Sequence, residues 1–282
     1  MKRTIIDEKI EQFKLHLVNE EKSHATIEKY IRDINAFSAW INDKELNKNA
    51  VIAYKEYLIS RFQPSSVNSM LSSVNGFFAY LEWHDLRVKT LKQQKQIFSR
   101  EEKELTKQEY ERLLNAAKEK QNNRLHLIMQ TICSSGIRIS ELQFVTVEAV
   151  RLQRAEVKCK GKIRTVILPK SLCKLLKRYI AENKIKSGSV FVTKGGKPLN
   201  RSNIWKDMKK LCKTANVLHS KVFPHNLRHL FARTFYKIEK DIVRLADLLG
   251  HSNVNTTRIY TIESGNVHRQ KIQNLGLVCL RM

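Results

Sequence analysis

Apolar side chains recur every three or four positions along the first part of the chain, in four segments. The segments cover about residues 4–20, 23–41, 48–61 and 65–83. This spacing is typical of amphipathic helices that bury one face. Pro64 is predicted to close the third helix, so that the fourth begins after it. We therefore predict a small bundle of four helices joined by short loops.

The apolar spacing is lost between Leu86 and Lys103, where Lys and Gln dominate. A polar stretch of this kind is typical of the connector between two domains. We predict an N-terminal helical domain over residues 1–87, a basic linker over 88–103 and a C-terminal domain over 104–282.

The C-terminal domain is predicted to be mainly α with a small antiparallel β-sheet. Helical spacing resumes at Thr106, whereas residues 155–168 alternate about Gly161, which indicates a β-hairpin ended by Pro169. Residues 190–193 precede a glycine pair and predict another short strand. The remaining segments are predicted to be helices.

The charge balance indicates the kind of partner. The chain has 52 Lys and Arg against 27 Asp and Glu, a net charge of +25. Residues 1–100 contribute 16 basic and 12 acidic side chains, so most of the excess lies in the second part. A polyanion is the natural counterpart, because each cation placed on a phosphate releases condensed counterions. Membrane surfaces and acidic proteins fit less well, because the basic residues do not form one terminal amphipathic segment.

Two absences from the sequence bear on its compartment. No apolar run reaches the length of a membrane span, and the first residues return to charge at once, so we predict neither a transmembrane helix nor a signal peptide. The cysteines are scattered and none form a Cys-x-x-Cys pair: Cys133, Cys159, Cys173, Cys212 and Cys279. This pattern fits neither a disulfide framework nor a zinc ribbon and favours a reducing, cytoplasmic compartment.

Two basic residues stand close to glycines. Arg138 follows Gly136, so a broken helix would present its guanidinium near free backbone N–H groups. Lys160 precedes Gly161 at the expected hairpin tip, where an ammonium can swing into a groove, and Lys162 could take the same role. Each also has an ordinary interpretation, as a solvated surface arginine and as a lysine that blunts a β-edge.

A second block holds His225, Arg228 and His229 on one helical face. The two histidines have the i, i+4 spacing of zinc ligands, but the metalloprotease pattern requires Glu directly after the first one, and Asn226 stands there. Imidazole and guanidinium groups on one face suit a phosphoryl oxyanion better. The alternative is a helix surface that only faces DNA.

Tyr260 lies nine residues after His251. A lone tyrosine is normally half-buried core, and a phenol of pKa ~10 is a weak nucleophile unless its developing charge is stabilised. Tyr260 therefore matters chemically only if cations and donors surround it.

In sequence order, Arg138, Lys160, His225-x-x-Arg228, His251 and Tyr260 resemble the tyrosine recombinase (phage integrase) family, in its Xer-like and transposon-resolvase-like forms. The matching motifs are Gly-Ile-Arg-Ile-Ser-Glu-Leu, the hairpin lysine, His-x-Leu-Arg-His and Leu-Gly-His. The hairpin is one residue shorter than the Lys-Gly-x-Lys-x-Arg form, so the Lys-Gly pair is what favours Lys160 over Lys162.

The resemblance implies a site-specific enzyme that needs no metal and no cofactor. Tyr260 would attack a DNA phosphate to give a 3′-phosphotyrosyl intermediate, while Arg138 and Arg228 hold the non-bridging oxygens. Lys160 would protonate the 5′-oxygen and His225 would assist proton movement. His251 would bind the phosphate or orient its neighbours. Glu141 would position Arg138 or a histidine, unless it is a plain surface carboxylate.

The resemblance also implies partners and an outcome. The N-terminal helices would be a core-binding domain, and the substrate would be double-stranded DNA with short inverted-repeat core sites. Residues 264–282 would dock on a neighbouring protomer in a homo-tetramer on two DNA sites, or else pack on their own domain. Holliday-junction recombination would serve integration, excision or cointegrate resolution. The alternatives are a non-catalytic basic DNA-binding regulator and a type IB topoisomerase.

Overall fold

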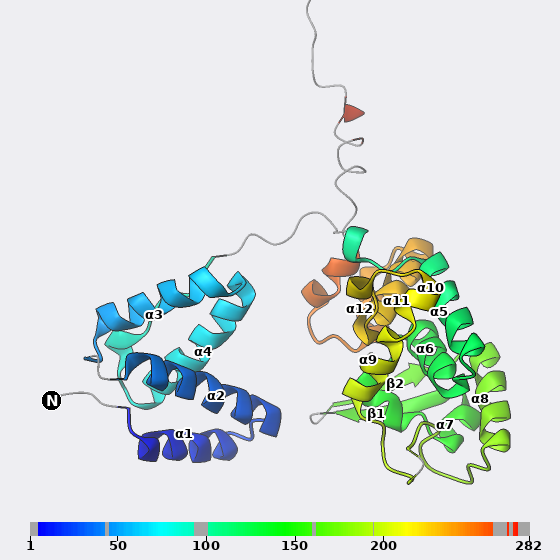
Figure 1. The fold of residues 1–282 in the computed structure, drawn as a ribbon, viewed down its shortest axis with the longest axis horizontal. Coiled ribbons are helices and arrows are strands. Elements are labelled where there is room, and N and C mark those ends of the chain that lie inside the picture. Colours follow the sequence, from blue (N-terminus) through cyan, green and yellow to red (C-terminus); the bar gives the residue numbers. More distant parts are fainter. Residues whose placement is uncertain are drawn as a thin grey trace, which may run out of the picture. The chain divides into compact units, whose positions relative to one another are not determined.

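The structure is a computed structural model that describes residues 5–42, 45–92, 101–159, 162–193, 195–261, 270 and 273–275. The chain divides into two compact units, residues 1–95 and 96–282 (Figure 1). Both units are built mainly from helices, and the second also holds a two-stranded antiparallel sheet. The predicted fold class is confirmed. The predicted domain limits at residues 87 and 103 stay predictions.

The first unit contains the predicted bundle of four helices. These are α1 (Asp7–Asn19), α2 (His24–Ile41), α3 (Lys48–Arg61) and α4 (Pro64–Tyr80), followed by the short 3-10 helix η1 (His84–Leu86). Aromatic side chains fill the core between them: the Phe37 ring lies edge-on to Phe78 at 5.7 Å, and Phe13 lies edge-on to Phe77 at 5.3 Å. The apolar stripe of each helix supplies this core.

One detail of this bundle differs from the prediction. Pro64 begins α4 instead of ending α3, because a fixed φ and a missing N–H suit the first position of a helix. On α3 the buried residues are Val51, Tyr54 and Leu58, while Ile52 is exposed. Val51 shares the i, i+3, i+7 stripe with the other two, and Ile52 lies one position off it.

The second unit begins with η2 and is centred on α6, which packs against α5, α8, α9 and α11. Its elements are η2 (Glu101–Lys103), α5 (Lys107–Glu119), α6 (Asn123–Ser135), η3 (Ile139–Phe144), α7 (Val147–Leu152), β1 (Arg154–Cys159), β2 (Lys162–Ile167), α8 (Lys170–Glu182), α9 (Arg201–Lys209), α10 (Cys212–Ala215), η4 (His219–Lys221), α11 (Pro224–Glu239), α12 (Ile242–Leu249), η5 (Val254–Thr256) and η6 (Arg258–Tyr260).

The sheet is the predicted hairpin. β1 and β2 pair antiparallel, with Val157 opposite Arg164, and the alternate residues Ala155 and Val157 face the core. The short strand predicted at 190–193 is wrong, because the described residues there make only single bridges, such as Val192 with Pro198. The backbone bonds of this segment go to two different places: the Val190 N–H donates to the Val145 carbonyl at 2.9 Å and the Thr193 N–H to the Lys197 carbonyl at 2.8 Å, so no continuous ladder forms.

No helix within the described ranges is long and apolar enough to span a bilayer.

Candidate active site

Two glycines end helices at the site and turn the chain toward it. Gly136 follows α6 with φ +65° and Gly250 follows α12 with φ +63°, a left-handed conformation that side chains disfavour. A Cβ atom on Gly136 would lie 2.5 Å from the Phe231 ring, and one on Gly250 would lie 2.3 Å from Cδ of Arg164. Both turns therefore need glycine for conformation and for space. They aim Arg138 and His251 at the same region.

Arg228 on α11 joins the ends of these two helices. Its side chain is only 1% exposed, and its Nη1 donates to the Gly136 carbonyl. Its Nη2 donates to the Leu249 carbonyl at 2.7 Å and to Nε2 of His251 at 3.1 Å. Burial, followed by the repulsion of Arg138, lowers the pKa of Arg228 to about 10, so the guanidinium is still charged at neutral pH.

His251 is held in one tautomer by its two partners. An arginine can only donate, so Nε2 of His251 must accept from Arg228, and Nδ1–H donates to Oγ1 of Thr257 at 2.9 Å. Burial and the nearby Arg228 lower the pKa of His251 to about 4, which keeps the ring neutral. His251 thus bridges Arg228 and Thr257, and both of its predicted roles stay predictions.

Tyr260 on η6 is 4% exposed and lies among imidazole rings. The His229 ring meets it edge-on at 4.8 Å, and the His251 ring stacks on it at 6.2 Å. Burial raises the pKa of Tyr260, and the charge of Arg228 opposes that rise. The phenol is therefore protonated at neutral pH and already beside the cation that would stabilise its anion.

His225 and His229 form a neutral pair beside this tyrosine. Their ring centres lie 4.5 Å apart on successive turns of α11. Burial, followed by His225 and Arg228, lowers the pKa of His229 to about 4. Partial loss of water contact, followed by Arg228 and Arg138, lowers that of His225, although His225 lies at the exposed edge. Neutral imidazoles can accept a proton at pH 7.

Arg138 and Arg164 share the carboxylate of Glu141. Oε1 of Glu141 accepts from Nη1 of Arg138 at 2.8 Å, and Oε2 accepts from the Arg138 backbone N–H at 2.9 Å and from Nη2 of Arg164 at 2.5 Å. Burial raises the pKa of Glu141, but these bonds outweigh it and the pKa is lowered. Glu141 is thus a buried anion that holds Arg138, and the surface-carboxylate interpretation is wrong.

The structure brings together five of the predicted site residues: Arg138, His225, Arg228, His251 and Tyr260. Lys160 lies outside the described residues, and so does the side chain of Lys162, so the choice between them stays a prediction.

Three residues of this arrangement are absent from the catalytic set that the resemblance implies. His229 had a signal, because it stands four positions after His225 on the same helical face. Arg164 also had a signal, as the arginine of the hairpin motif, but its partner Glu141 lies in a distant segment that only the fold brings near. Thr257 had none, because it contributes through a turn that only the fold positions. Within the described ranges, no group of three or more His, Cys, Asp or Glu side chains could hold a metal ion.

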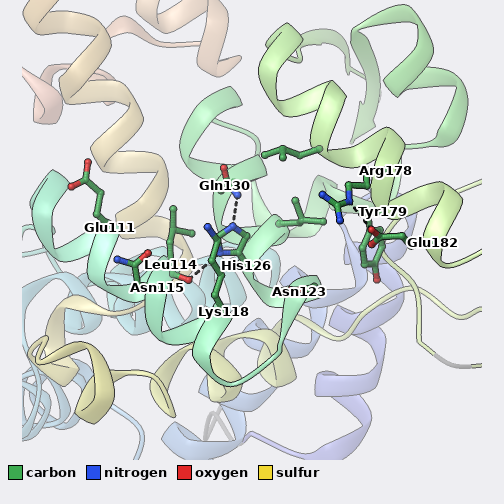
Figure 2. A pocket seen from close by; sticks show the side chains of 12 residues that line it. Glu111, Leu114, Asn115, Lys118, Asn123, His126, Gln130, Arg178, Tyr179 and Glu182 are labelled. Atoms are coloured by element: carbon green, nitrogen blue, oxygen red, sulfur yellow. Dashed lines mark hydrogen bonds and ion pairs between the residues drawn. The ribbon is translucent and has the colours of Figure 1, made fainter.

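The second unit has two pockets of interest, and only one of the two adjoins the site. A pocket of about 500 Å³ lies between α5, α6 and α8, and Figure 2 shows His126 within it. That ring is engaged by the Leu114 carbonyl at 3.0 Å and by Nε2 of Gln130 at 2.7 Å, and none of the site residues lines the pocket. A smaller hollow of about 380 Å³ is lined by Ile139, Trp205 and His225, so it adjoins the site.

Comparison with known proteins agrees with this arrangement. The family described as "Phage integrase family" matches residues 103–266, and "Phage integrase, N-terminal SAM-like domain" matches residues 10–85. The chain belongs to the phage integrase family. The family resemblance seen in the sequence is confirmed.

Relatives extend over nearly the whole chain. Tyrosine recombinase XerA of Thermococcus kodakarensis is 30% identical over 263 residues, covering 90% of each chain. Tyrosine recombinase XerD of Halalkalibacterium halodurans is 26% identical over 284 residues, covering 91% of this chain and 93% of the relative. The protein is therefore a DNA strand-exchange enzyme of the tyrosine recombinase class, and the non-catalytic regulator is not favoured.

Solved structures show the same fold. The crystal structure of XerA recombinase has 25% identity and a TM-score of 0.53, covering 95% of this chain and 98% of the other. XerH site-specific recombinase bound to its difH substrate has 19% identity and a TM-score of 0.68, covering 96% and 85%.

Proposed function

We propose that this protein cuts and rejoins duplex DNA at specific sites, with Tyr260 as the nucleophile. One observation carries the proposal: the buried Tyr260 phenol and Arg228 guanidinium form one cluster with the half-buried His251 imidazole, close to Arg138. A buried phenol in contact with cations is what a phosphate-attacking tyrosine requires.

In the first step the Tyr260 oxygen attacks the scissile phosphorus and the bond to the 5′-oxygen breaks. The phenol proton passes to a neutral imidazole, His225 or His229, and the 5′-oxygen takes a proton from the hairpin lysine, proposed to be Lys160. Arg138 and Arg228 balance the charge on the non-bridging oxygens. The product is a 3′-phosphotyrosyl link with a free 5′-hydroxyl.

In the second step a 5′-hydroxyl from the partner duplex attacks that link and releases Tyr260. One round of exchange gives a Holliday junction and a second round resolves it. The energy of the phosphodiester is kept in the protein–DNA bond, so this sequence of steps needs no nucleotide.

Tyr260 must first reach the phosphate. At 4% exposure the phenol has almost no contact with solvent, while Arg138 is exposed over 37% of its side chain. We expect DNA to be met by Arg138 first and the segment of η6 to turn Tyr260 outward as the duplex binds.

The partners follow from the same mechanism. We propose short inverted-repeat core sites and a homo-tetramer on two duplexes, assembled through exchange of residues 264–282. A lambda integrase tetramer bound to a Holliday junction, which shares the fold at a TM-score of 0.72, supports this stoichiometry by analogy. The tail lies almost wholly outside the described residues. Integration, excision and cointegrate resolution remain the proposed outcomes, in the cytoplasm.

A covalent-trapping assay tests the proposal. A preferred site is first selected from random-sequence duplexes with the full-length protein. Duplexes nicked near the centre of that site then lose the 5′-hydroxyl fragment after cleavage, so the wild-type protein should accumulate a covalent adduct. Tyr260→Phe should bind equally and form none. An adduct that persists in Tyr260→Phe, or its absence from the wild type, would refute the proposal.

A second measurement separates the recombinase from a type IB topoisomerase. Two duplexes that carry the selected site should yield recombinant products. Relaxation of a supercoiled plasmid without any recombinant would favour the topoisomerase.

A further inference from the structure

Arg164 on β2 bonds two segments that lie far from it in the sequence. Its side chain is 14% exposed, its Nη2 donates to Oε2 of Glu141 at 2.5 Å and its Nη1 donates to the Leu248 carbonyl at 2.9 Å. One guanidinium thus joins the sheet, the loop that carries Arg138 and the last turn of α12. A planar fork with fixed donors is what such a three-way contact needs.

Arg164 changes the net charge of the group that it forms with Glu141 and Arg138. Without Arg164, Glu141 and Arg138 would form a neutral pair. The negative charge of Glu141 would then cancel much of the positive potential that a phosphate should meet. With Arg164 on the second carboxylate oxygen, the group of two arginines and one glutamate carries a net charge of +1. Arg138 therefore keeps positive charge for a substrate, and 37% of its side chain is exposed to solvent.

The position of Arg164 also affects His251. The Leu248 carbonyl belongs to the turn that leads through Gly250 to His251. Gly250 has no Cβ atom, and the Arg164 side chain occupies the space that a Cβ atom would need. Arg138 itself reaches only weakly toward this turn, with Nη2 at 3.4 Å from the Gly250 carbonyl. Arg164 is thus the stronger tie between the two segments that carry Arg138 and His251.

We propose that Arg164 is a positioning residue for strand cleavage, which shares Glu141 with Arg138 so that Arg138 stays positively charged and fixed relative to His251. The inference rests on the proposed function. It assigns Arg164 to the part of that mechanism in which arginines balance charge on the non-bridging oxygens, and not to protonation of the 5′-oxygen by the lysine of the same hairpin.

Three forms of the selected nicked duplex test this assignment, with excess protein and a single turnover. The first has a normal scissile phosphate. The second has a methylphosphonate there, which lacks one charged non-bridging oxygen. The third has a 5′-bridging sulfur, whose thiolate leaves without a proton. Arg164→Ala should slow cleavage of the normal duplex by about 100-fold, the typical loss when one oxyanion contact is disturbed, with DNA affinity nearly unchanged.

The modified duplexes distinguish a defect in charge stabilisation from a defect in protonation of the leaving group. With the methylphosphonate, the ratio of the wild-type cleavage rate to that of Arg164→Ala should fall about tenfold, because less charge has to be balanced. The bridging sulfur should not reduce it. Lys160→Ala and Arg138→Ala serve as the references for a leaving-group defect and a charge defect.

Matched variants guard against a folding defect. Arg154→Ala removes an exposed arginine from the same sheet and should cleave like the wild type. Arg164→Lys keeps a cation near Glu141 but cannot serve both acceptors, so its rate should lie between those of the wild type and Arg164→Ala. If Arg164→Ala does not fold, the intermediate rate of Arg164→Lys on the three duplexes carries the test.

The outcomes are distinct. Rescue of Arg164→Ala by the bridging sulfur would mean that Arg164 acts through the lysine and would overturn the proposal. Equal losses of affinity and rate would make Arg164 a DNA contact and would also overturn it. Cleavage by Arg164→Ala at the wild-type rate would refute this inference alone, whereas no adduct from the wild type would refute the proposed function itself.

Discussion

At the scale of single residues, the site depends on charged groups that are buried but hydrogen-bonded. Arg228 gives its donors to the carbonyl ends of α6 and α12 and to His251, and Glu141 gives its acceptors to two arginines. A buried ion without partners costs far more than one that is bonded. The same contacts that stabilise the domain therefore arrange its chemistry.

Arg228→Lys should be damaging although it keeps the charge. A lysine cannot reproduce the fork that spans the carbonyls of Gly136 and Leu249. One of them would lose its donor, at a cost of about 2 kcal/mol in the free energy of unfolding. Urea unfolding measures this loss, and covalent trapping should show no adduct. A lysine variant as stable and as active as the wild type would contradict the structural role given to Arg228.

The lowered pKa values of His229 and His251 predict a pH dependence of stability. Both lie at about 4, below the ordinary 6.5. Between these values the unfolded chain binds protons that the folded chain excludes, so the free energy of unfolding falls as pH is lowered through this window. Urea unfolding at pH 7 and pH 5 measures the slope, which should be smaller in His229→Gln. An unchanged slope in that variant would contradict the burial of a neutral His229.

At the scale of elements, the site is assembled from the ends of helices. The C-terminal ends of α6 and α12 both turn at a glycine with positive φ, and α11 carries Arg228 to both of them. The sheet adds Arg164 to the end of α12. Helix ends suit this purpose because their last carbonyls are free to accept bonds from cations.

The two roles of Gly250 can be separated with a second glycine. Gly250→Ala meets both a left-handed φ and the Arg164 side chain at 2.3 Å, so it should destabilise the fold, displace Arg164 and slow cleavage. Gly188→Ala also has a positive φ but meets nothing within 4 Å, so it should cost only about 1 kcal/mol and leave cleavage unchanged. Thermal unfolding and trapping rates compare the two variants. Equal effects on cleavage would show that the contact with Arg164 does not matter.

At the scale of the whole molecule, charge governs the encounter with DNA. The net charge of +25 is concentrated after residue 100, in the part that also holds the site. Such a field attracts a polyanion at long range, and salt screens it. The affinity for DNA should therefore depend strongly on ionic strength, whereas the chemistry of the buried cluster should not.

Salt titration with Tyr260→Phe checks this division, because that variant binds without cleaving. The logarithm of the affinity should fall by about 0.9 per logarithmic unit of salt for each phosphate neutralised. Cleavage rates of the wild type, measured at saturating protein, should stay nearly constant over the same range. A flat binding curve would contradict the role given to the basic excess.

Much of this protein is determined by its sequence alone. The four helices of the first unit, the hairpin and the order of Arg138, Arg228, His251 and Tyr260 can be read directly, because periodicity, helix ends and motifs depend on residues a few positions apart. The same reasoning failed where a neighbouring segment decides the outcome. It predicted a strand at 190–193, which buries consecutive side chains in the core instead.

The tertiary structure decided which partners those residues have. Arg228 meets Gly136 across 92 positions, Arg164 meets Leu248 across 84, and His229 meets the Tyr260 ring although no motif pairs them. Contacts of this length arise only when several helices pack around a common core, since burial forces each charged group to find whichever partner the packing brings near. The sequence therefore specified the chemical groups, and their packing made them a site.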